Sequence, residues 1–222
     1  MILALGLSGL MAGSARAQED AEDELGNWLI WNGTVRFSDH WSMFTEAQLR
    51  LWEVASNPSE WFVRGAAHYD LSDKAYVGLG YMYSETTPFE GGPGDSENRI
   101  YEQCTIKHSW ARSVFEHRYR LEQRWRDEAG FSSRFRYRLQ VTTPLNRATM
   151  EPGAWFFNAY DEIFLNFDSE RTFDQNRLYA AAGHQFTPTS NLQLGLLWQA
   201  RTEEDFFRLQ IFYTHNFDLR DR

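Results

Sequence analysis

The sequence predicts an all-β protein, an antiparallel transmembrane β-barrel of about ten to twelve strands. Three observations predict this fold. Apolar and polar residues alternate with a period of two through most of the chain. The alternating runs are longer than the strands of soluble proteins usually are, and several tryptophans stand where a run begins or ends.

The composition excludes several other classes. The chain has 222 residues, of which 16% are aromatic, and a net charge of −9. Its mean hydropathy is −0.57, and it contains no apolar run of about 18 residues that could form a membrane-spanning helix. The aromatic content excludes intrinsic disorder, and the acidic balance argues against a nucleic-acid partner. A single cysteine, Cys104, excludes a disulfide framework and a cysteine-based zinc site.

Residues 1–17 are predicted to be a signal peptide, because an apolar stretch at 2–13 is followed by Ala15-Arg16-Ala17, a small-x-small cleavage site. No basic residue precedes the apolar stretch, so we expect the natural start codon to lie upstream of Met1. The alternative is a frayed helix at the start of a soluble protein. Residues 18–27 form an acidic tail that we expect to be solvated, and residues 28–219 form the predicted barrel.

The clearest strands are predicted at 41–54, 114–126 and 134–143. In the last of these, Phe135, Tyr137 and Leu139 alternate with three arginines, so one face is apolar and the other charged. Similar runs begin near Trp28, Trp61, Ala75, Arg99, Ala154, Asp174, Ser190 and Phe206. Eleven runs result, whereas single-chain bacterial barrels have even strand numbers, which is why the prediction spans about ten to twelve strands.

The predicted connections alternate in length. Tight turns are expected at 38–40, 72–74, 111–112 and 188–190, and longer loops at 55–60, 85–98, 127–133 and 168–173. In outer-membrane barrels, short turns face the periplasm and long loops face outward. The segment 144–153 is the exception, because it falls where a short turn is expected.

The predicted inward faces carry many charges, and 20 of the 22 basic residues are arginine. Arginine is preferred to lysine where a planar fork meets carboxylates. One interpretation is an Arg–Glu network that seals a structural barrel, which we favour because a barrel of this size encloses little space. The other is a positively biased pore that selects anions. The residues predicted to line the lumen are Glu46, Arg50, Arg64, Glu116, Arg118, Arg120, Glu122, Arg124, Arg126, Arg134, Arg136, Arg138, Glu162 and Arg177.

The two arginine-rich runs, 114–126 and 134–143, are consecutive and are predicted to pair as a hairpin. Arginine would then face arginine across much of the ladder, and like charges directly opposite each other are destabilising. Carboxylates must therefore lie nearby. We expect Glu162 and Glu46 to be the principal partners, reaching the arginines from other walls.

Signatures of enzymes are weak. The chain has no nucleophile elbow, no zinc-protease motif and no phosphate-binding loop, and its six histidines lack metal-ligand spacing. Asp161 and Glu162 are adjacent on a strand and face opposite ways. The sequence therefore predicts no catalytic, metal or cofactor residue. An outer-membrane enzyme acting on lipid or lipopolysaccharide is kept as an alternative, and a soluble lipocalin-like ligand carrier as a second.

Several segments resemble the family catalogued as domain of unknown function 2490. They are NAYDEIFLN at 158–166, FDQNRLY at 173–179, RFRYRL at 134–139 and EAQLR at 46–50. The resemblance spans nearly all of the chain after residue 17. It implies a bacterial outer-membrane β-barrel with no assigned activity, whose surroundings are outer-membrane lipid and lipopolysaccharide. The resemblance leaves the oligomeric state open.

Overall fold

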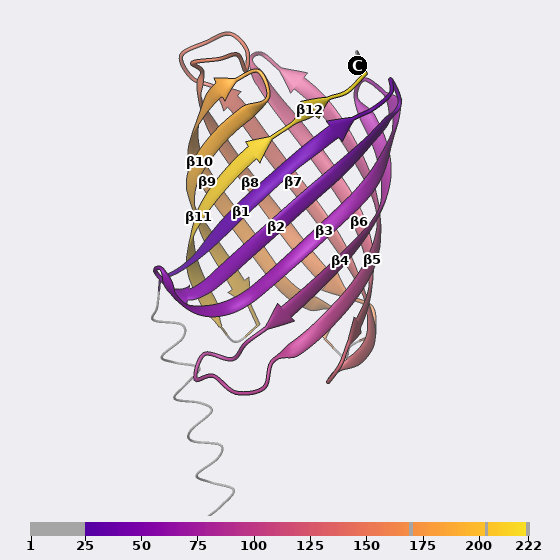
Figure 1. The fold of residues 1–222 in the computed structure, drawn as a ribbon, viewed down its shortest axis with the longest axis vertical. Coiled ribbons are helices and arrows are strands. Elements are labelled where there is room, and N and C mark those ends of the chain that lie inside the picture. The colour runs from indigo at the N-terminus through magenta and orange to yellow at the C-terminus, as the bar shows by residue number, and fades with distance from the viewer. Residues whose placement is uncertain (1–24, 169–170, 203, 221–222) are drawn as a thin grey trace, which may run out of the picture.

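The chain forms a closed β-barrel in the computed structural model, which describes residues 25–168, 171–202 and 204–220 (Figure 1). Within these residues, no helix is long and apolar enough to cross a membrane. The strands are β1 (Gly26–Arg36), β2 (Trp41–Glu53), β3 (Ser56–Ser72), β4 (Ala75–Thr86), β5 (Asp95–Trp110), β6 (Ser113–Arg126), β7 (Gly130–Pro144), β8 (Trp155–Asn166), β9 (Phe173–Thr187), β10 (Ser190–Arg201), β11 (Asp205–His215) and the two-residue β12 (Phe217–Asp218).

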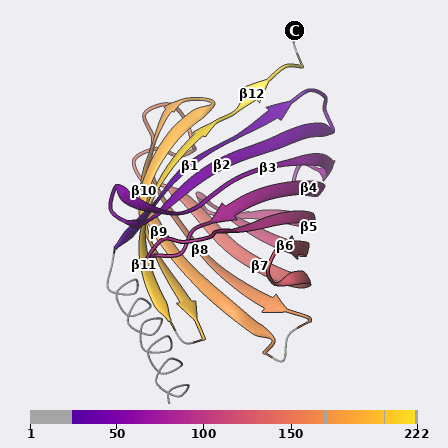
Figure 2. The same cartoon turned by 60° about the horizontal axis from the view of Figure 1, so that its bottom comes forward.

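From β1 to β11, each strand pairs with its sequence neighbour in antiparallel fashion, and β11 pairs with β1 in parallel to close the barrel (Figure 2). The short β12 also pairs with β1 in parallel. The seam runs from Gly26 opposite Arg208 to Asn32 opposite Thr214. The wall therefore has eleven strands in the described part of the chain, within the predicted range. This odd number equals the number of alternating runs in the sequence, because a parallel seam closes the barrel.

We call the two ends of the barrel the upper and lower rims, as drawn in Figure 1. The upper rim holds the connections 37–40, 73–74, 111–112, 145–154 and 188–189, and the lower rim holds 54–55, 87–94, 127–129, 167–172 and 202–204. The tight turns were predicted correctly, and so was the long exception after Pro144. Only two lower-rim connections are long, so the regular alternation in loop length is wrong.

The loop predicted at 55–60 is a two-residue turn followed by strand β3. Ala55 and Asn57 adopt positive φ angles of 64° and 53°, and the Asn27 side chain accepts a hydrogen bond from the Ala55 amide at 2.9 Å. The pairing of β2 with β3 shifts register between Arg50 and Leu51, opposite Pro58. Proline has no backbone N–H to donate, and a bulge accommodates this because the strand pairing is interrupted there. The polar segment around Pro58 can therefore form a strand.

The predicted loop 127–133 is also shorter, because Gly130, with a φ of 67°, already begins β7 opposite Arg126. At the other end of the chain, β1 begins at Gly26 rather than Trp28. Residues 1–24, which include the predicted signal peptide and most of the acidic tail, lie outside the described residues.

The outward faces of the strands are largely apolar in the middle of the wall, as the alternation predicts. Representative outward side chains with at least 39% exposure are Leu29, Met43, Leu49, Val63, Leu79, Ile100, Leu121, Phe157, Leu178, Leu194, Leu196 and Phe207. Tryptophans mark both ends of this belt. Trp41, Trp110 and Trp155 lie where strands meet the upper rim, and Trp61, Trp125 and Trp198 lie towards the lower rim.

The C-terminal segment is tied to the upper rim. Arg220 donates hydrogen bonds to both carboxylate oxygens of Asp218, at 2.9 and 2.6 Å, and lies 3.2 Å from Asp39 in the first upper turn. These hydrogen bonds from Arg220 lower the pKa of Asp218 to about 2. The ion pair between Arg220 and Asp218 therefore keeps its charges at any neutral or mildly acidic pH.

Candidate functional site

The candidate site is the interior of the barrel, which contains a cavity of about 1130 Å³. Its lining includes Asp73 and Lys74 at the upper rim and Asp95 and Arg126 at the lower rim, so the cavity reaches both ends. Among the lining residues that the structure describes, sixteen are Lys or Arg and nine are Asp or Glu. The interior is therefore rich in cations although the chain as a whole carries a net charge of −9.

The structure brings most of the predicted interior residues to this cavity. Glu122 is the one that does not reach its surface, because the arginines around it leave its side chain 0% exposed. The predicted residues that line the cavity are Glu46, Arg50, Arg64, Glu116, Arg118, Arg120, Arg124, Arg126, Arg134, Arg136, Arg138, Glu162 and Arg177.

Glu122 is the centre of the largest ion-pair cluster. Its Oε2 accepts hydrogen bonds from Arg134 Nε and Nη2 at 2.9 and 2.7 Å. Its Oε1 accepts from Arg136 Nη1 at 2.7 Å and from Arg99 Nη1 at 3.3 Å. Strand register explains this, because Glu122 on β6 stands directly opposite Arg134 on β7, and β5 supplies Arg99 from the other side.

Glu162 on β8 is the second acceptor. Its Oε1 accepts from Arg118 Nη2 at 2.6 Å and from Arg136 Nη2 at 2.8 Å. The predicted hairpin of β6 and β7 is confirmed, with Arg118 opposite Arg138 and Arg120 opposite Arg136. Glu162 is therefore the partner that the prediction required.

The prediction for Glu46 is wrong. Its carboxylate accepts from Arg64 at 2.7 Å and from the Gln48 amide at 2.6 Å. Glu46 on β2 and Arg64 on β3 are direct cross-strand neighbours, so this local pair forms in place of one that would cross the lumen. Glu116 likewise pairs locally, with Arg138 at 3.0 Å and Lys107 at 3.4 Å.

Sequence reasoning missed several members of the network. Glu97 bridges Arg99, at 2.5 Å, and Arg124, at 2.6 Å. The sequence predicts a loop over 85–98, whereas β5 begins at Asp95 and therefore includes Glu97. The alternation of Glu97, Arg99 and Tyr101 with Asn98 and Ile100 already indicated a strand with Glu97 on its inward face. The sequence predicts a run that begins near Asp174 without assigning its carboxylate to the inward face, and Asp174 pairs with Arg134 at 2.7 Å.

Aromatic rings lie against several of the guanidinium groups. Arg136 is 4.2 Å from the centre of the Phe164 ring, and Arg120 is 4.2 Å from that of Tyr101. Arg50, which pairs with Glu60, lies 3.9 Å from the Trp28 ring. Such contacts favour cations that have lost part of their water.

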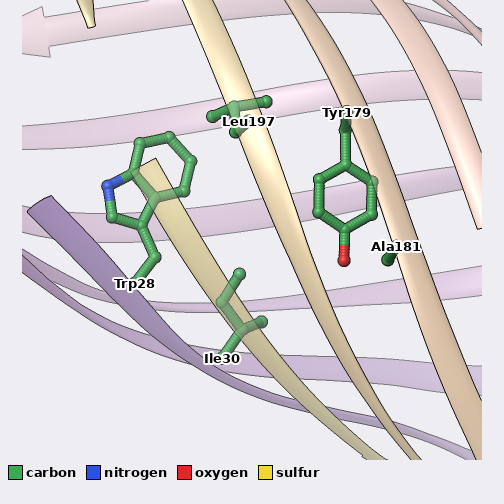
Figure 3. Close-up of a cluster of buried hydrophobic side chains, with 5 residues drawn as sticks. All are labelled: Trp28, Ile30, Tyr179, Ala181 and Leu197. Atoms are coloured by element: carbon green, nitrogen blue, oxygen red, sulfur yellow. The ribbon is translucent and has the colours of Figure 1, made fainter. Parts of the chain in front are cut away.

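One stretch of the inner wall is apolar. Trp28, Ile30, Tyr179, Ala181 and Leu197 form a buried cluster on β1, β9 and β10 (Figure 3), and Tyr160 and Phe212 pack against it. We call these seven residues the apolar wall. The interior thus has an apolar side and a charged side, because the ion-pair cluster around Glu122 lies on β5, β6 and β7.

The described residues hold no group of three or more His, Cys, Asp or Glu that could bind a metal ion. His68 is buried at 7% exposure and contacts the Gln103 amide at 2.9 Å. The neighbouring carboxylates Asp161 and Glu162 face opposite sides of the wall, since Asp161 is exposed and Glu162 is 3% exposed.

Three comparisons relate this barrel to known proteins. Residues 25–210 match the family model described as "Protein of unknown function (DUF2490)". No curated protein matches the chain. Among solved structures, the chain is similar to the siderophore receptor PirA from Pseudomonas aeruginosa, with 12% identity and a TM-score of 0.32, over 78% of this chain and 35% of the receptor. The chain thus spans about a third of the length of that receptor.

Proposed function

The chain belongs to the family described as "Protein of unknown function (DUF2490)", and we propose that it is a bacterial outer-membrane barrel whose cation-rich interior conducts small anions. Its surroundings would be outer-membrane lipid and lipopolysaccharide. The observation that carries the proposal is a cavity lined from rim to rim in which basic residues outnumber acidic ones. Rings of basic side chains select anions in pores.

The outer surface supports a membrane location. The belt of outward apolar side chains would be costly to expose to water over the whole wall, but suits contact with acyl chains. Tryptophans near both rims suit the two membrane interfaces. A soluble lipocalin-like carrier would need a polar outer surface, so this polarity opposes that alternative.

The orientation follows from the turns. Four of the five upper-rim connections are tight, and the last strands end at the upper rim. Because short turns in such barrels face the periplasm, we assign the upper rim to the periplasm and the lower rim to the cell exterior. The parallel seam would then start β1 at the exterior end.

The proposal is tested in planar lipid bilayers with the full chain refolded into detergent. Under a KCl gradient, the reversal potential should have the sign of chloride preference. Arg120→Gln should reduce this preference, because Arg120 lines the cavity and its nearest carboxylate, Glu122, is 3.8 Å away. Arg147→Gln is the matched control, because Arg147 lies in the loop 145–154, pairs with Glu151 and does not line the cavity.

Each other outcome has a clear meaning. A folded protein without discrete conductance would overturn the pore proposal and support a structural barrel sealed by the cluster around Glu122. Turnover of a lipid or lipopolysaccharide without conductance would favour the enzyme alternative. A protein that remains soluble and monomeric without detergent would overturn the membrane location.

A further inference from the structure

The apolar wall is unusual for the inside of a water-filled barrel. Inward side chains of outer-membrane barrels are generally polar, yet Trp28 and Ile30 line the cavity here and pack with the buried Leu197. The rings of Tyr160 and Tyr179 lie 4.8 Å apart, and Tyr179 lies 5.8 Å from Phe212. Small-molecule sites are typically concave surfaces of this kind, with aromatic side chains and a few polar groups.

A guanidinium stands at the edge of this wall. Arg177 lies 5.1 Å from the centre of the Trp28 ring and 4.7 Å from that of Phe164. Its Nε donates to the Gln175 side chain at 3.2 Å. In the described part of the chain, no carboxylate comes within 4.0 Å of Arg177, in contrast to most arginines of the opposite wall.

Strand register places a carboxylate beside Arg177 but directs it elsewhere. Glu162 is the direct cross-strand neighbour of Arg177, yet its Oε1 accepts from Arg118 and Arg136. Arg177 is half-buried, and a cation that is partly removed from water without a carboxylate partner loses solvation that a bound anion would restore. The donors of Arg177 therefore suit an external anion.

Buried polar atoms beside the wall also lack regular hydrogen bonds within the described residues. They are the Tyr179 hydroxyl, the Asn158 carbonyl oxygen and both amide atoms of Gln210. These residues are 2%, 6% and 0% exposed, and the Tyr160 hydroxyl approaches the Gln210 amide. Tyr179 belongs to the apolar wall, and register puts Gln210 opposite Trp28 and Asn158 opposite Ala181, so these two adjoin it. Buried polar groups are usually paired, and these remain for a ligand with polar atoms.

We propose that the apolar wall and Arg177 form a binding site for a small aromatic carboxylate. The planar guanidinium can hold a carboxylate with two parallel hydrogen bonds. The ring of the ligand would pack against Trp28 and Tyr179, and Gln210 would meet a polar substituent. An inorganic anion would satisfy Arg177 and leave the rings unused, and a neutral aromatic molecule would do the reverse. This inference goes beyond the proposed conduction and does not depend on it.

Benzoate is the probe, with binding measured by titration calorimetry on the full chain refolded in detergent. Acetate tests the carboxylate alone and benzyl alcohol the ring alone. We expect benzoate to bind about tenfold more tightly than either, because each lacks one half of the recognition. Benzoate that binds no more tightly than acetate would overturn the proposal.

The variant Arg177→Gln should weaken benzoate binding about tenfold or more. Arg36→Gln is the control inside the lumen, because Arg36 ends β1 at the upper rim, pairs with Asp70 at 2.8 Å and is remote from the apolar wall. The affinity of the Arg36→Gln variant for benzoate should stay within about twofold of that of the original chain. Equal losses in the two variants would show a general charge effect and refute the site.

Folding is checked by the mobility of unheated samples in denaturing gels and by circular dichroism. If Arg177→Gln does not fold, Arg177→Lys keeps the charge without the planar fork and should still weaken binding. Conductance in KCl is measured separately. A chain that conducts chloride but does not bind benzoate refutes only this site, and a chain that binds benzoate without conducting refutes only the pore.

Discussion

Replacing Glu122 with glutamine tests whether one buried carboxylate organises the interior. The change keeps the size of the side chain and removes its charge, while Arg99, Arg134 and Arg136 keep theirs. Each of these arginines also has a second carboxylate, Glu97, Asp174 and Glu162 respectively. These remaining partners keep each cation paired, but three guanidinium groups then surround a neutral side chain in place of a carboxylate.

The expected magnitude follows from burial. Removing one partner of a buried ion pair costs about 3–5 kcal/mol, because the other charge is left uncompensated. The Glu122 side chain is 0% exposed and touches three guanidiniums within 3.3 Å. We therefore expect Glu122→Gln to lower the free energy of unfolding by about 3–5 kcal/mol.

The assay is urea unfolding of the full chain in detergent micelles or lipid vesicles, followed by tryptophan fluorescence under reversible conditions. Glu116→Gln is the matched control, since its carboxylate also pairs with two cations but is 20% exposed. It should cost about 1 kcal/mol or less, because water reaches this half-buried pair and weakens its attraction. If both variants lose equally little, water in the cavity screens these charges and the reasoning about Glu122 is refuted.

Three further predictions concern the lumen, the wall and the outer surface. Glu162→Gln should lower the urea midpoint of unfolding and shift the KCl reversal potential further towards chloride preference. The reason is that the change removes the carboxylate shared by Arg118 and Arg136 from a cation-rich interior. Unchanged values of both quantities would contradict this account. Gly80→Ala should destabilise the barrel by about 1–3 kcal/mol in the same urea assay, because a Cβ would overlap a buried tyrosine ring. Gly65→Ala, where the nearest side-chain atom would be 3.3 Å away, should cost clearly less, and equal losses would exclude this overlap as the cause. Leu194→Lys, at an outward position that is 55% exposed, should cost about 2–4 kcal/mol in lipid vesicles, whereas Leu145→Lys in an upper-rim loop should be near neutral. Equal effects of the two lysines would argue against lipid contact at the wall.

The alternation of the sequence determined which side chains face inward. Side chains on a strand point to opposite faces in turn, so the arginines at 134, 136 and 138 had to share one face and the phenylalanine, tyrosine and leucine between them the other. The short connection between β6 and β7 also determined their pairing. These features depend only on local geometry, which is why the sequence alone predicted them.

The tertiary structure decided which charges meet. Glu46 and Glu162 both stand at inward positions of alternating strands, so the sequence does not distinguish them. In the barrel, Glu46 stands beside Arg64 on a neighbouring strand, whereas Glu162 stands beside the arginine-rich hairpin of β6 and β7. The position of every residue around the barrel depends on strand register, on the bulge between Arg50 and Leu51 and on the parallel closure of β1 with β11. These are long-range consequences of closing the sheet, and alternation along one strand contains no information about them. The register of β5, β6 and β7 therefore made Glu122 the centre of the network, and closure of β1 onto β11 left Arg177 beside the Trp28 ring.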